Sequence, residues 1–411
     1  MSAARPPIVA ITGGYLTANK GGAAMTLAVH DHVRRRHGST RLLTIYPEVD
    51  RAQRIANLDV VSWKPLDLLV ALPFALLIGA ARTLRLPHRP LALTKGLRAL
   101  LDADVVVDVA GISFVDGRGL PILGYNLLMT GIPLLVGTPV VKASQAVGPF
   151  EQRLNRVAAR IVLPRVRAIC ARGDRTEMHL RDLGLTNVRA AADLAFVLAI
   201  STEAQEAAAA VIAATVGDHA FVTVAPSSVV LGYCEERGID YIGALAALCR
   251  QVIHDGREVL IVAHSIHPSG REGRMHDTPV CRALAAAVAH ERCHLLEAEL
   301  GPAELRTVIE GGDALVSSRF HAMISGLSTL TPTLVMGWSH KYAEVLRAFG
   351  LEHCAVDYAD IDADRLSTRI VELLAEAPAT REAIEKGLPA VQASARGNLA
   401  AIDEALQRNV A

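Results

Sequence analysis

DALVSSRFHAMISGLSTLTPTLVMGWSHK, residues 313 to 341, is the stretch of this 411-residue chain that decides the fold. A short apolar run of strand type, Ala314 to Val316, is followed by two serines and then by small and apolar residues with helical spacing. A second apolar strand begins after the turn at Thr331 and Pro332. Strand, turn, helix and strand in this order are typical of a parallel α/β sheet.

The polar residues of this stretch gather at its first turn, where the strand ends and the helix begins. Ser317 and Ser318 can cap the helix, and Arg319 and His321 then fall in its first turn. A helix N-terminus attracts anions, an arginine fork binds phosphate or carboxylate, and a histidine exchanges a proton near neutral pH. The stretch therefore predicts an anion site with a proton donor. The alternative is a buried arginine paired with Asp313, beside a histidine that only packs.

Strand, turn and helix recur in two successive halves of the chain. The first half opens with the apolar strand at 8–11, and the pattern restarts at the strand 221–225, after an alanine-rich helix at 203–215. We therefore expect an α/β protein with two Rossmann-like domains, whose parallel sheets face each other across a cleft. The expected domains are 1–200 and 201–375, followed by C-terminal helices at 376–411 that can pack back on the first domain.

Polar residues and glycines follow several strands of the first half. Ligands of open parallel sheets bind beyond the carboxyl ends of the strands, so residues at these ends are candidates for substrate binding. A structural turn explains each of them as well, and for the arginine so does an ion pair with Asp174 or Glu177. The candidates are Gly13, Asn19, Gly21, Asp108, Gly111, Gln145 and Arg172.

Composition argues against several function classes. The 42 Lys and Arg residues balance 42 Asp and Glu residues, and aromatic residues make up 4% of the chain, so we expect no nucleic-acid partner. The six cysteines form no CxxC pair, and the N-terminus leads straight into a strand pattern, which indicates a cytoplasmic protein with reduced thiols and no signal peptide. His264, His267 and His276 lie in a polar region without a flanking ligand motif, so we expect no metal.

One segment of the first half is unusually apolar. Residues 68–81, LLVALPFALLIGAA, carry no charge, and the five charged residues between 68 and 101 are all cations: Arg82, Arg85, Arg89, Lys95 and Arg98. An apolar run of 14 residues is too short to span a bilayer as a helix. A buried helix followed by a basic loop explains the segment. The alternative is peripheral contact of residues 68–98 with the anionic inner face of a membrane.

Five short motifs, in order along the chain, resemble those of the polysaccharide pyruvyl transferase family. The most specific is Ser317-x-Arg319-Phe320-His321, which Pro332 and Lys341 follow. The other four are NKGGAAM at 19–25, DVAG at 108–111, QAVGPF at 145–150, and the arginine at 172 with DLAF at 193–196.

The chain departs from the family pattern at two positions. Family members usually carry an acid where Ala23 stands, and often glycine where Leu330 stands. The first departure concerns the contacts of the N-terminal loop, and the second concerns the shape of a turn.

The resemblance implies that phosphoenolpyruvate donates an enolpyruvyl group to hydroxyls of a saccharide or lipid-linked saccharide, forming a pyruvate ketal in cell-envelope biosynthesis. It implies a GT-B-like architecture, with the acceptor on residues 1–200 and the donor on 201–375. A donor with a phosphate and a carboxylate needs cations, which Arg319 and Arg172 can supply. His321 is then the expected general acid. Lys341 reaches the donor or closes the cleft, and no cofactor is expected.

Two other functions fit the same pattern. A glycosyltransferase of GT-B architecture would use a nucleotide sugar and need a carboxylate for the ribose, for which Glu344 is the nearest acid after the central stretch. A non-catalytic relative would only bind a saccharide.

Overall fold

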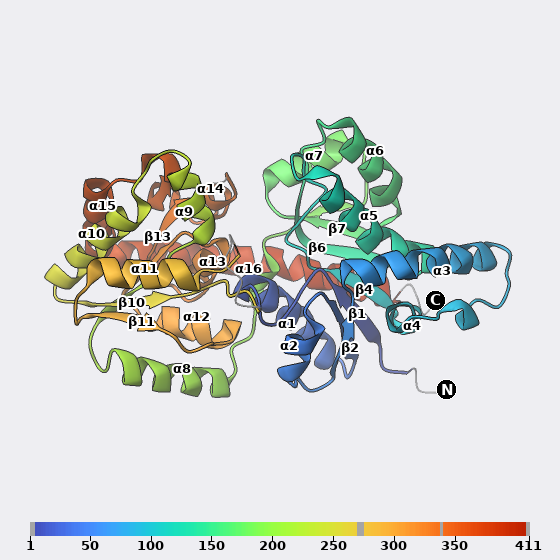
Figure 1. Cartoon of the computed structure of the whole chain (residues 1–411), viewed down its shortest axis with the longest axis horizontal. Coiled ribbons are helices and arrows are strands. Elements are labelled where there is room, and N and C mark those ends of the chain that lie inside the picture. The colour runs from blue at the N-terminus through green and yellow to red at the C-terminus, as the bar shows by residue number, and fades with distance from the viewer. Residues whose placement is uncertain (1–4, 269–274, 338–339, 408–411) are drawn as a thin grey trace. The chain divides into compact units, whose positions relative to one another are not determined.

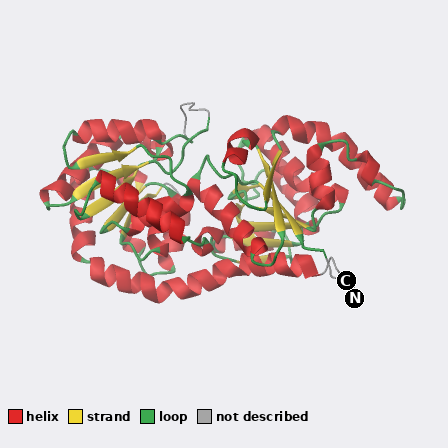
Figure 2. Cartoon of the chain, turned by 90° about the horizontal axis from the view of Figure 1, so that it is seen from below, coloured by secondary structure: helices red, strands yellow, loops and turns green. Residues whose placement is uncertain are grey.

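The computed structural model describes residues 5–268, 275–337 and 340–407, and the chain divides into two α/β units (Figure 1). Unit 1 consists of residues 1–16, 25–197 and 392–411, and unit 2 consists of residues 17–24 and 198–391. In each unit, helices cover both faces of a sheet, as Figure 2 shows. All described strand pairs are parallel, which confirms the expected α/β fold with two parallel sheets.

The sheet of unit 1 has the strand order β3-β2-β1-β4-β6-β7-β8, and the short β5 pairs with β6. Its strands are β1 (Ile8–Thr12), β2 (Ser39–Thr44), β3 (Leu58–Ser62), β4 (Val105–Asp108), β5 (Ile112–Ser113), β6 (Val140–Val147), β7 (Ala168–Ala171) and β8 (Val188–Ala190). Its helices are α1 (Lys20–Arg34), α2 (Pro47–Ala52), α3 (Pro65–Thr83), α4 (Lys95–Asp102), α5 (Gly119–Val136), α6 (Arg153–Val162) and α7 (Asp174–Asp182).

The sheet of unit 2 has the order β11-β10-β9-β12-β13-β14. Its strands are β9 (Phe221–Ala225), β10 (Glu258–Val262), β11 (Cys293–Leu296), β12 (Ala314–Ser317), β13 (Thr333–Gly337) and β14 (Ala355–Asp357). The helices are α8 (Thr202–Thr215), α9 (Ser228–Glu235), α10 (Tyr241–His254), α11 (Thr278–Val288), α12 (Pro302–Glu310), α13 (Phe320–Ser328), α14 (His340–Arg347), α15 (Ala363–Ala375) and the start of α16 (Ala377–Gln407).

Both sheets reverse their strand order at one point. In unit 1 the first strand, β1, lies between β2 and β4, and in unit 2 the first strand, β9, lies between β10 and β12. Loops that follow the two central strands of such a sheet leave in opposite directions and open a crevice at the carboxyl ends. These ends, after β1 and β4 and after β9 and β12, are therefore where the fold favours a binding site.

Helices α3 and α5 each contribute one face to the core of unit 1. Ala71, Ala75 and Ile78 of α3 are fully buried in the same cluster as Met129 and Ile132 of α5. The structure extends α3 to 19 residues. Helices α3 and α5 are both long and apolar enough to cross a membrane, and 28% of an 18-residue apolar stretch in each is buried. The expected buried helix is thus buried on its inner face only.

Two segments join the unit that lies farther from them in sequence. Residues 17–24 belong to unit 2, where Asn19 forms an antiparallel bridge with Ser265 and the N–H of Ile266 donates to the carbonyl of Ala18 at 2.7 Å. The last part of α16 belongs to unit 1, where Asp403 pairs with Arg36 at 2.8 Å. The units therefore differ from the contiguous ranges 1–200 and 201–375.

A β-bulge interrupts β6 between Lys142 and Gln145, where the register with β7 shifts. Within it, Ser144 has a left-handed backbone with φ of 51°. The buried side chain of Asn398 on α16 supports this residue: its Oδ1 accepts from the N–H of Ser144 at 2.8 Å, and its Nδ2 donates to the carbonyl of Ala192 at 3.0 Å. A helix from the end of the chain thus stabilises a strained residue of the central sheet.

We expect Asn398→Ala to destabilise unit 1 by about 1–3 kcal/mol, because it leaves the N–H of Ser144 and the carbonyl of Ala192 buried without this partner. Calorimetric unfolding measures the effect. Arg396→Ala, an exposed change on the same helix, is the matched control and should shift the free energy of unfolding by less than about 0.5 kcal/mol. Equal melting curves for the two variants would contradict the anchoring role of Asn398.

Candidate functional site

The carboxylate of Asp277 organises the carboxyl edge of the sheet in unit 2. It is fully buried and accepts from the N–H of Ser228, which follows β9, at 3.1 Å, and from the N–H of Ser265, which follows β10, at 3.0 Å. It also accepts from Arg319, which follows β12, through Nε at 2.8 Å and through Nη2. One side chain therefore fastens three strand ends around the reversal point of the sheet.

The ion pair fixes both the position and the charge of Arg319. Burial alone would lower the pKa of its guanidinium, but the charge and hydrogen bonds of Asp277 outweigh this effect and raise the pKa. Asp313, the partner considered from sequence, instead bonds Arg257 at 2.8 Å. Arg319 is thus a rigid, permanent cation just before α13.

Ser317 and Ser318 are fully buried and use their hydroxyls inside the protein. Ser317 Oγ accepts from the N–H of Arg319 at 2.9 Å, so it stabilises the turn, while the first turn of α13 receives no side-chain cap. Ser318 Oγ bonds the hydroxyl of the buried Tyr241 at 2.7 Å, and its carbonyl accepts from Tyr342 at 3.1 Å. Either serine could contact a substrate through its hydroxyl only if its hydrogen bond inside the protein were replaced by one to the substrate.

His321 is the second residue of α13 and packs against the N-terminal loop of the chain. A Cβ atom added to Gly21 would lie 2.0 Å from Cγ of His321, so only glycine fits there. Asn19 holds this loop by capping α1: its Oδ1 accepts from the N–H of Gly21 at 2.9 Å. His321 as a whole residue is partly exposed, whereas its ring atom Nε2 is buried. The structure thus brings together Asn19, Gly21, Arg319 and His321, four of the residues expected at the site.

A second histidine reveals the electrostatic character of this region. His264 follows β10 and is 4% exposed, and its carbonyl accepts from the N–H of Lys20 at 3.2 Å. Burial lowers the pKa of His264 well below its usual value, so the ring is neutral at pH 7. The side chains whose charged forms would lower it further are His321, Arg319, Lys20 and Arg306. These four residues are hereafter called the cationic cluster.

The cationic cluster includes two residues that sequence reasoning missed. Lys20 is 3% exposed, and burial lowers the pKa of its ammonium group, while Glu299 lies 3.9 Å away. Arg306 on α12 is 2% exposed and donates to the carbonyl of Leu198 at 3.4 Å. Buried cations are uncommon, and their concentration at one sheet edge favours an anionic ligand.

In unit 1, Asp108 and Gln145 meet at the corresponding sheet edge, around a lysine that sequence reasoning also missed. Lys142 Nζ lies 2.5 Å from the Asp108 carboxylate and donates to Gln145 Oε1 at 3.3 Å. Gln145 Nε2 donates to the carbonyl of Asp108 at 3.0 Å, and Ser113 bonds Gln145 Oε1 at 2.5 Å. Burial raises the pKa of Tyr125 to about 12, with the charge of Asp108 as the next cause.

The bulge in β6 explains how Lys142 and Gln145 reach the same place. Side chains of a regular strand alternate between its two faces, so residues three apart point in opposite directions. The extra residue at Ser144 re-aims the strand and turns both side chains toward Asp108. A lone lysine within the apolar run VVKA was the only signal in the sequence for this pair.

Arg172 and Gly111 complete this group in unit 1. The guanidinium of Arg172 donates to Asp193 at 2.5 Å through Nη1 and to the carbonyl of Gly111 at 2.9 Å through Nη2. The partner is Asp193 rather than Asp174 or Glu177. Gly13 has φ of 72°, and a Cβ there would lie 2.7 Å from the carboxylate of Asp108, so it too borders this group.

Lys341 lies in the first turn of α14, next to the residue whose hydroxyl bonds Ser318, and is partly buried. Among the described residues, no group of three or more His, Cys, Asp or Glu side chains is placed to hold a metal. Part of the polar loop considered for a metal, residues 269–274, lies outside the described residues.

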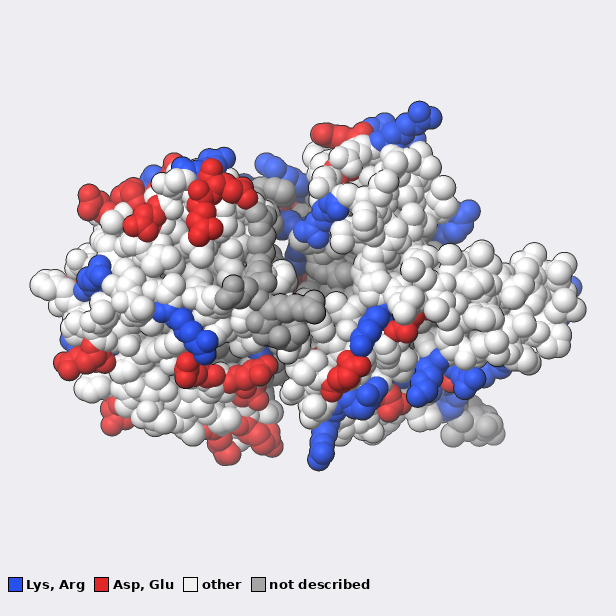
Figure 3. All heavy atoms as spheres, in the orientation of Figure 1, with Lys and Arg blue, Asp and Glu red and all other residues white. Residues whose placement is uncertain are grey.

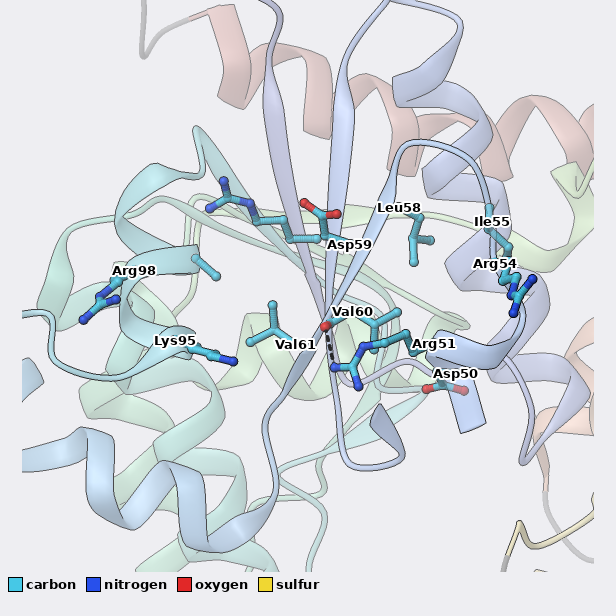
Figure 4. Close-up of a pocket in the computed structure, with 12 residues that line it drawn as sticks. Asp50, Arg51, Arg54, Ile55, Leu58, Asp59, Val60, Val61, Lys95 and Arg98 are labelled. Carbon is cyan, nitrogen blue, oxygen red and sulfur yellow. Dashed lines mark hydrogen bonds between the residues drawn. The ribbon is translucent and has the colours of Figure 1, made fainter. Parts of the chain in front are cut away.

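A cavity of about 440 Å³ lies elsewhere on unit 1, beside the edge strand β3 (Figure 4). Arg51 and Arg54, from α2 and the loop after it, and Lys95 and Arg98 of α4 line it with Arg41 of β2. None of the residues expected to bind substrate lines this cavity. The cavity is therefore separate from the candidate residues at the sheet edges.

The description of the family model that matches this chain is polysaccharide pyruvyl transferase, and the match covers residues 19–340. The amylovoran biosynthesis protein AmsJ of Erwinia amylovora is 26% identical over 271 residues, which are 62% of this chain and 61% of AmsJ. The alignment therefore spans about three fifths of that relative.

Solved structures with the same architecture include two enzymes of nucleotide-sugar chemistry. Arabidopsis thaliana UGT89C1, complexed with UDP-L-rhamnose, superposes with a TM-score of 0.57 at 12% identity, covering 99% of this chain and 100% of that one. The UDP-GlcNAc 2-epimerase of Neisseria meningitidis, bound to UDP-GlcNAc, gives 0.56 at 11% identity, covering 92% and 94%. This similarity shows the GT-B-like fold.

We expect Gly21→Ala to destabilise unit 2 by about 1–3 kcal/mol, because the added methyl group overlaps the ring of His321. Gly397→Ala is the control, since Gly397 is also helical but a Cβ there meets nothing within 4 Å. That variant should be neutral or stabilising by up to about 1 kcal/mol. Denaturant unfolding measures both, and a neutral Gly21→Ala would refute the close contact.

The lowered pKa of His264 predicts an acid-sensitive unit 2. Below the unfolded pKa of about 6.5, the unfolded chain binds a proton at this ring that the folded protein does not, so stability falls as the pH falls. The contribution is at most about 1.4 kcal/mol per pH unit. The Tm should therefore fall less between about pH 7 and 5 for His264→Asn than for the wild type. His254→Asn, an exposed control, should show the same fall in Tm as the wild type.

Proposed function

The chain belongs to the polysaccharide pyruvyl transferase family, and we propose that it transfers the enolpyruvyl group of phosphoenolpyruvate to two hydroxyls of a saccharide. The product is a pyruvate ketal. The observation that carries the proposal is the contact between Gly21 and His321. It joins the motif that opens the family match to the motif near its end, within the cationic cluster of unit 2.

The donor binds, in this proposal, to unit 2. Phosphoenolpyruvate carries a phosphate and a carboxylate, and the cationic cluster offers four positively charged or protonatable groups at the carboxyl edge of the sheet. Arg319 contributes a charge that Asp277 holds in place, and the first turn of α13 adds its N–H groups and positive dipole end. The environment therefore matches a small dianion or trianion better than a neutral ligand.

His321 acts as the general acid. It donates a proton to the methylene carbon, so C2 becomes electrophilic and the first sugar hydroxyl adds there, returning its proton to the imidazole. The second hydroxyl then forms the second C–O bond at C2 as the C–O bond to phosphate breaks, and its proton leaves with the phosphate. The fixed charge of Arg319 stabilises the departing group. The reaction consumes no cofactor in this scheme.

The acceptor binds to unit 1. Asp108, Gln145 and Arg172 lie at the carboxyl ends of β4, β6 and β7, and such carboxylate, amide and guanidinium groups recognise sugar hydroxyls in pairs. Glycine at position 13 lets the turn after β1 pack directly against Ala110 and the carboxylate of Asp108. We propose a saccharide or lipid-linked saccharide of the cell envelope as acceptor, and a cytoplasmic protein that works at the inner face of the membrane.

The direct experiment combines the purified protein, phosphoenolpyruvate and candidate envelope glycans or lipid-linked sugars. Phosphate release together with a product heavier by one pyruvate ketal would support the proposal. Binding of UDP- or GDP-sugars without phosphate release from phosphoenolpyruvate would instead favour a glycosyltransferase. Saccharide binding with neither activity would favour a non-catalytic relative.

We expect His321→Gln to lower kcat by about 10²–10⁴-fold with a smaller change in KM, because proton donation is lost while the other three members of the cationic cluster, Arg319, Lys20 and Arg306, remain. Steady-state phosphate release measures this. The control is His353→Gln, an exposed histidine of the same unit, which should keep wild-type kinetics. Near-normal turnover by His321→Gln would refute its assignment as the acid.

A further inference from the structure

Exposed apolar side chains concentrate on one part of unit 1. Among the described residues, sixteen large apolar side chains are conspicuously exposed, and only Met178, Met275 and Val371 lie outside α3 with the loop after it, the start of α5, and α6. The other thirteen are Leu66, Leu69, Val70, Leu76, Leu77, Leu84, Leu86, Leu93, Leu120, Ile122, Leu154, Val157 and Ile161. A monomeric protein rarely exposes a patch of this kind without a partner.

The outward face of α3 is apolar along its whole length. Leu66, Leu69, Leu76 and Leu77 recur at helical spacing and are between 53% and 70% exposed. Its inward face includes small residues that allow close packing: a Cβ at Gly79 would lie 3.2 Å from the carbonyl of Leu135 on α5. Helix α3 therefore carries large apolar side chains on both faces: Leu68 and Ile78 lie in the core, whereas Leu69, Leu76 and Leu77 face away from it.

Helices α5 and α6 extend this face. Helix α5 packs on α3 and also contacts α6, so the three outer faces adjoin. On α6, the apolar Leu154, Val157 and Ile161 alternate with three exposed arginines, Arg153, Arg156 and Arg160. The outer faces of α3, the start of α5 and α6 are hereafter called the apolar face.

Positive charge borders the apolar face. The whole chain is neutral, yet residues 82–167 carry eleven exposed Lys and Arg residues against one exposed acid, Glu151. Figure 3 shows the part of unit 1 that α3 forms as largely uncharged, with Lys and Arg along its edge. Lys95 and Arg98 of this segment also line the cavity of Figure 4, together with three further arginines. Leucines bordered by arginines match a bilayer whose surface is anionic.

We propose that the apolar face docks unit 1 onto a membrane containing anionic lipids, with the leucines in the headgroup and upper acyl region and the arginines at lipid phosphates. The inner faces of α3 and α5 pack into the core of unit 1, so these helices lie in the plane of the membrane and do not cross it. A second copy of the chain is a poorer occupant, because it would bring two arginine-bordered surfaces together. The inference goes beyond the proposed reaction and does not depend on it, since it uses none of the residues assigned to that chemistry.

Co-sedimentation of the full chain with vesicles tests the proposal. The protein should bind phosphatidylcholine vesicles that contain phosphatidylglycerol, bind pure phosphatidylcholine vesicles at least tenfold more weakly, and lose binding at high salt. Two variants separate the contributions: a triple variant Leu69→Gln, Leu76→Gln, Leu77→Gln and a triple variant Arg153→Gln, Arg156→Gln, Arg160→Gln. Each should weaken binding to the anionic vesicles at least tenfold.

The matched control replaces apolar residues that are equally exposed outside the apolar face, Met178→Gln with Val371→Gln, and should bind vesicles as the wild type does. Thermal unfolding verifies that all variants are folded. Absence of binding to anionic vesicles, or equal binding by the wild type and both triple variants, would overturn the proposal. So would a leucine variant that only abolishes self-association in light scattering, since the face would then join two copies of the chain.

Discussion

One buried carboxylate holds the working edge of unit 2 together. Asp277 receives hydrogen bonds from residues that follow three different parallel strands, and one of these is the arginine that precedes α13. A charge in a protein interior is tolerated only when it is paired and its remaining lone pairs are satisfied, and here both conditions are met. Because Arg319 is fixed by this pair, the start of α13 and the imidazole of His321 are fixed with it.

Unit 1 also has a buried ion pair at the carboxyl edge of its sheet, built from different elements. Its buried pair, Asp108 with Lys142, also lies at the point where the strand order reverses, but both partners come from neighbouring strands. The amide of Gln145 joins them only because the bulge at Ser144 re-aims β6. In both units, then, the doubly wound topology supplies the location, and one buried ion pair supplies the rigidity on which a polar site depends.

Periodicity and turn chemistry were sufficient to predict the strands whose ends carry polar residues, and hence the two parallel sheets. They could not predict which carboxylates pair with the two arginines, because Asp277 is 42 positions from Arg319 and Asp193 is 21 positions from Arg172. They also missed Lys142, whose role depends on a bulge that no local pattern marks. The apolar run at 68–81 was recognised, but only the packing of α3 on α5 shows that Leu69, Leu76 and Leu77 face outward.

The path of the chain limits how the two units can be separated or recombined. Residues 17–24 complete unit 2 although the strand before them and most of the helix after them belong to unit 1, and α16 returns to unit 1 after all of unit 2 has been made. A gene fragment cut near residue 198 would encode a unit 2 without the glycine that accommodates His321, and a unit 1 without the asparagine that steadies its bulge. Exchange of one unit between relatives would therefore require four junctions, after residues 16, 24, 197 and 391, rather than one.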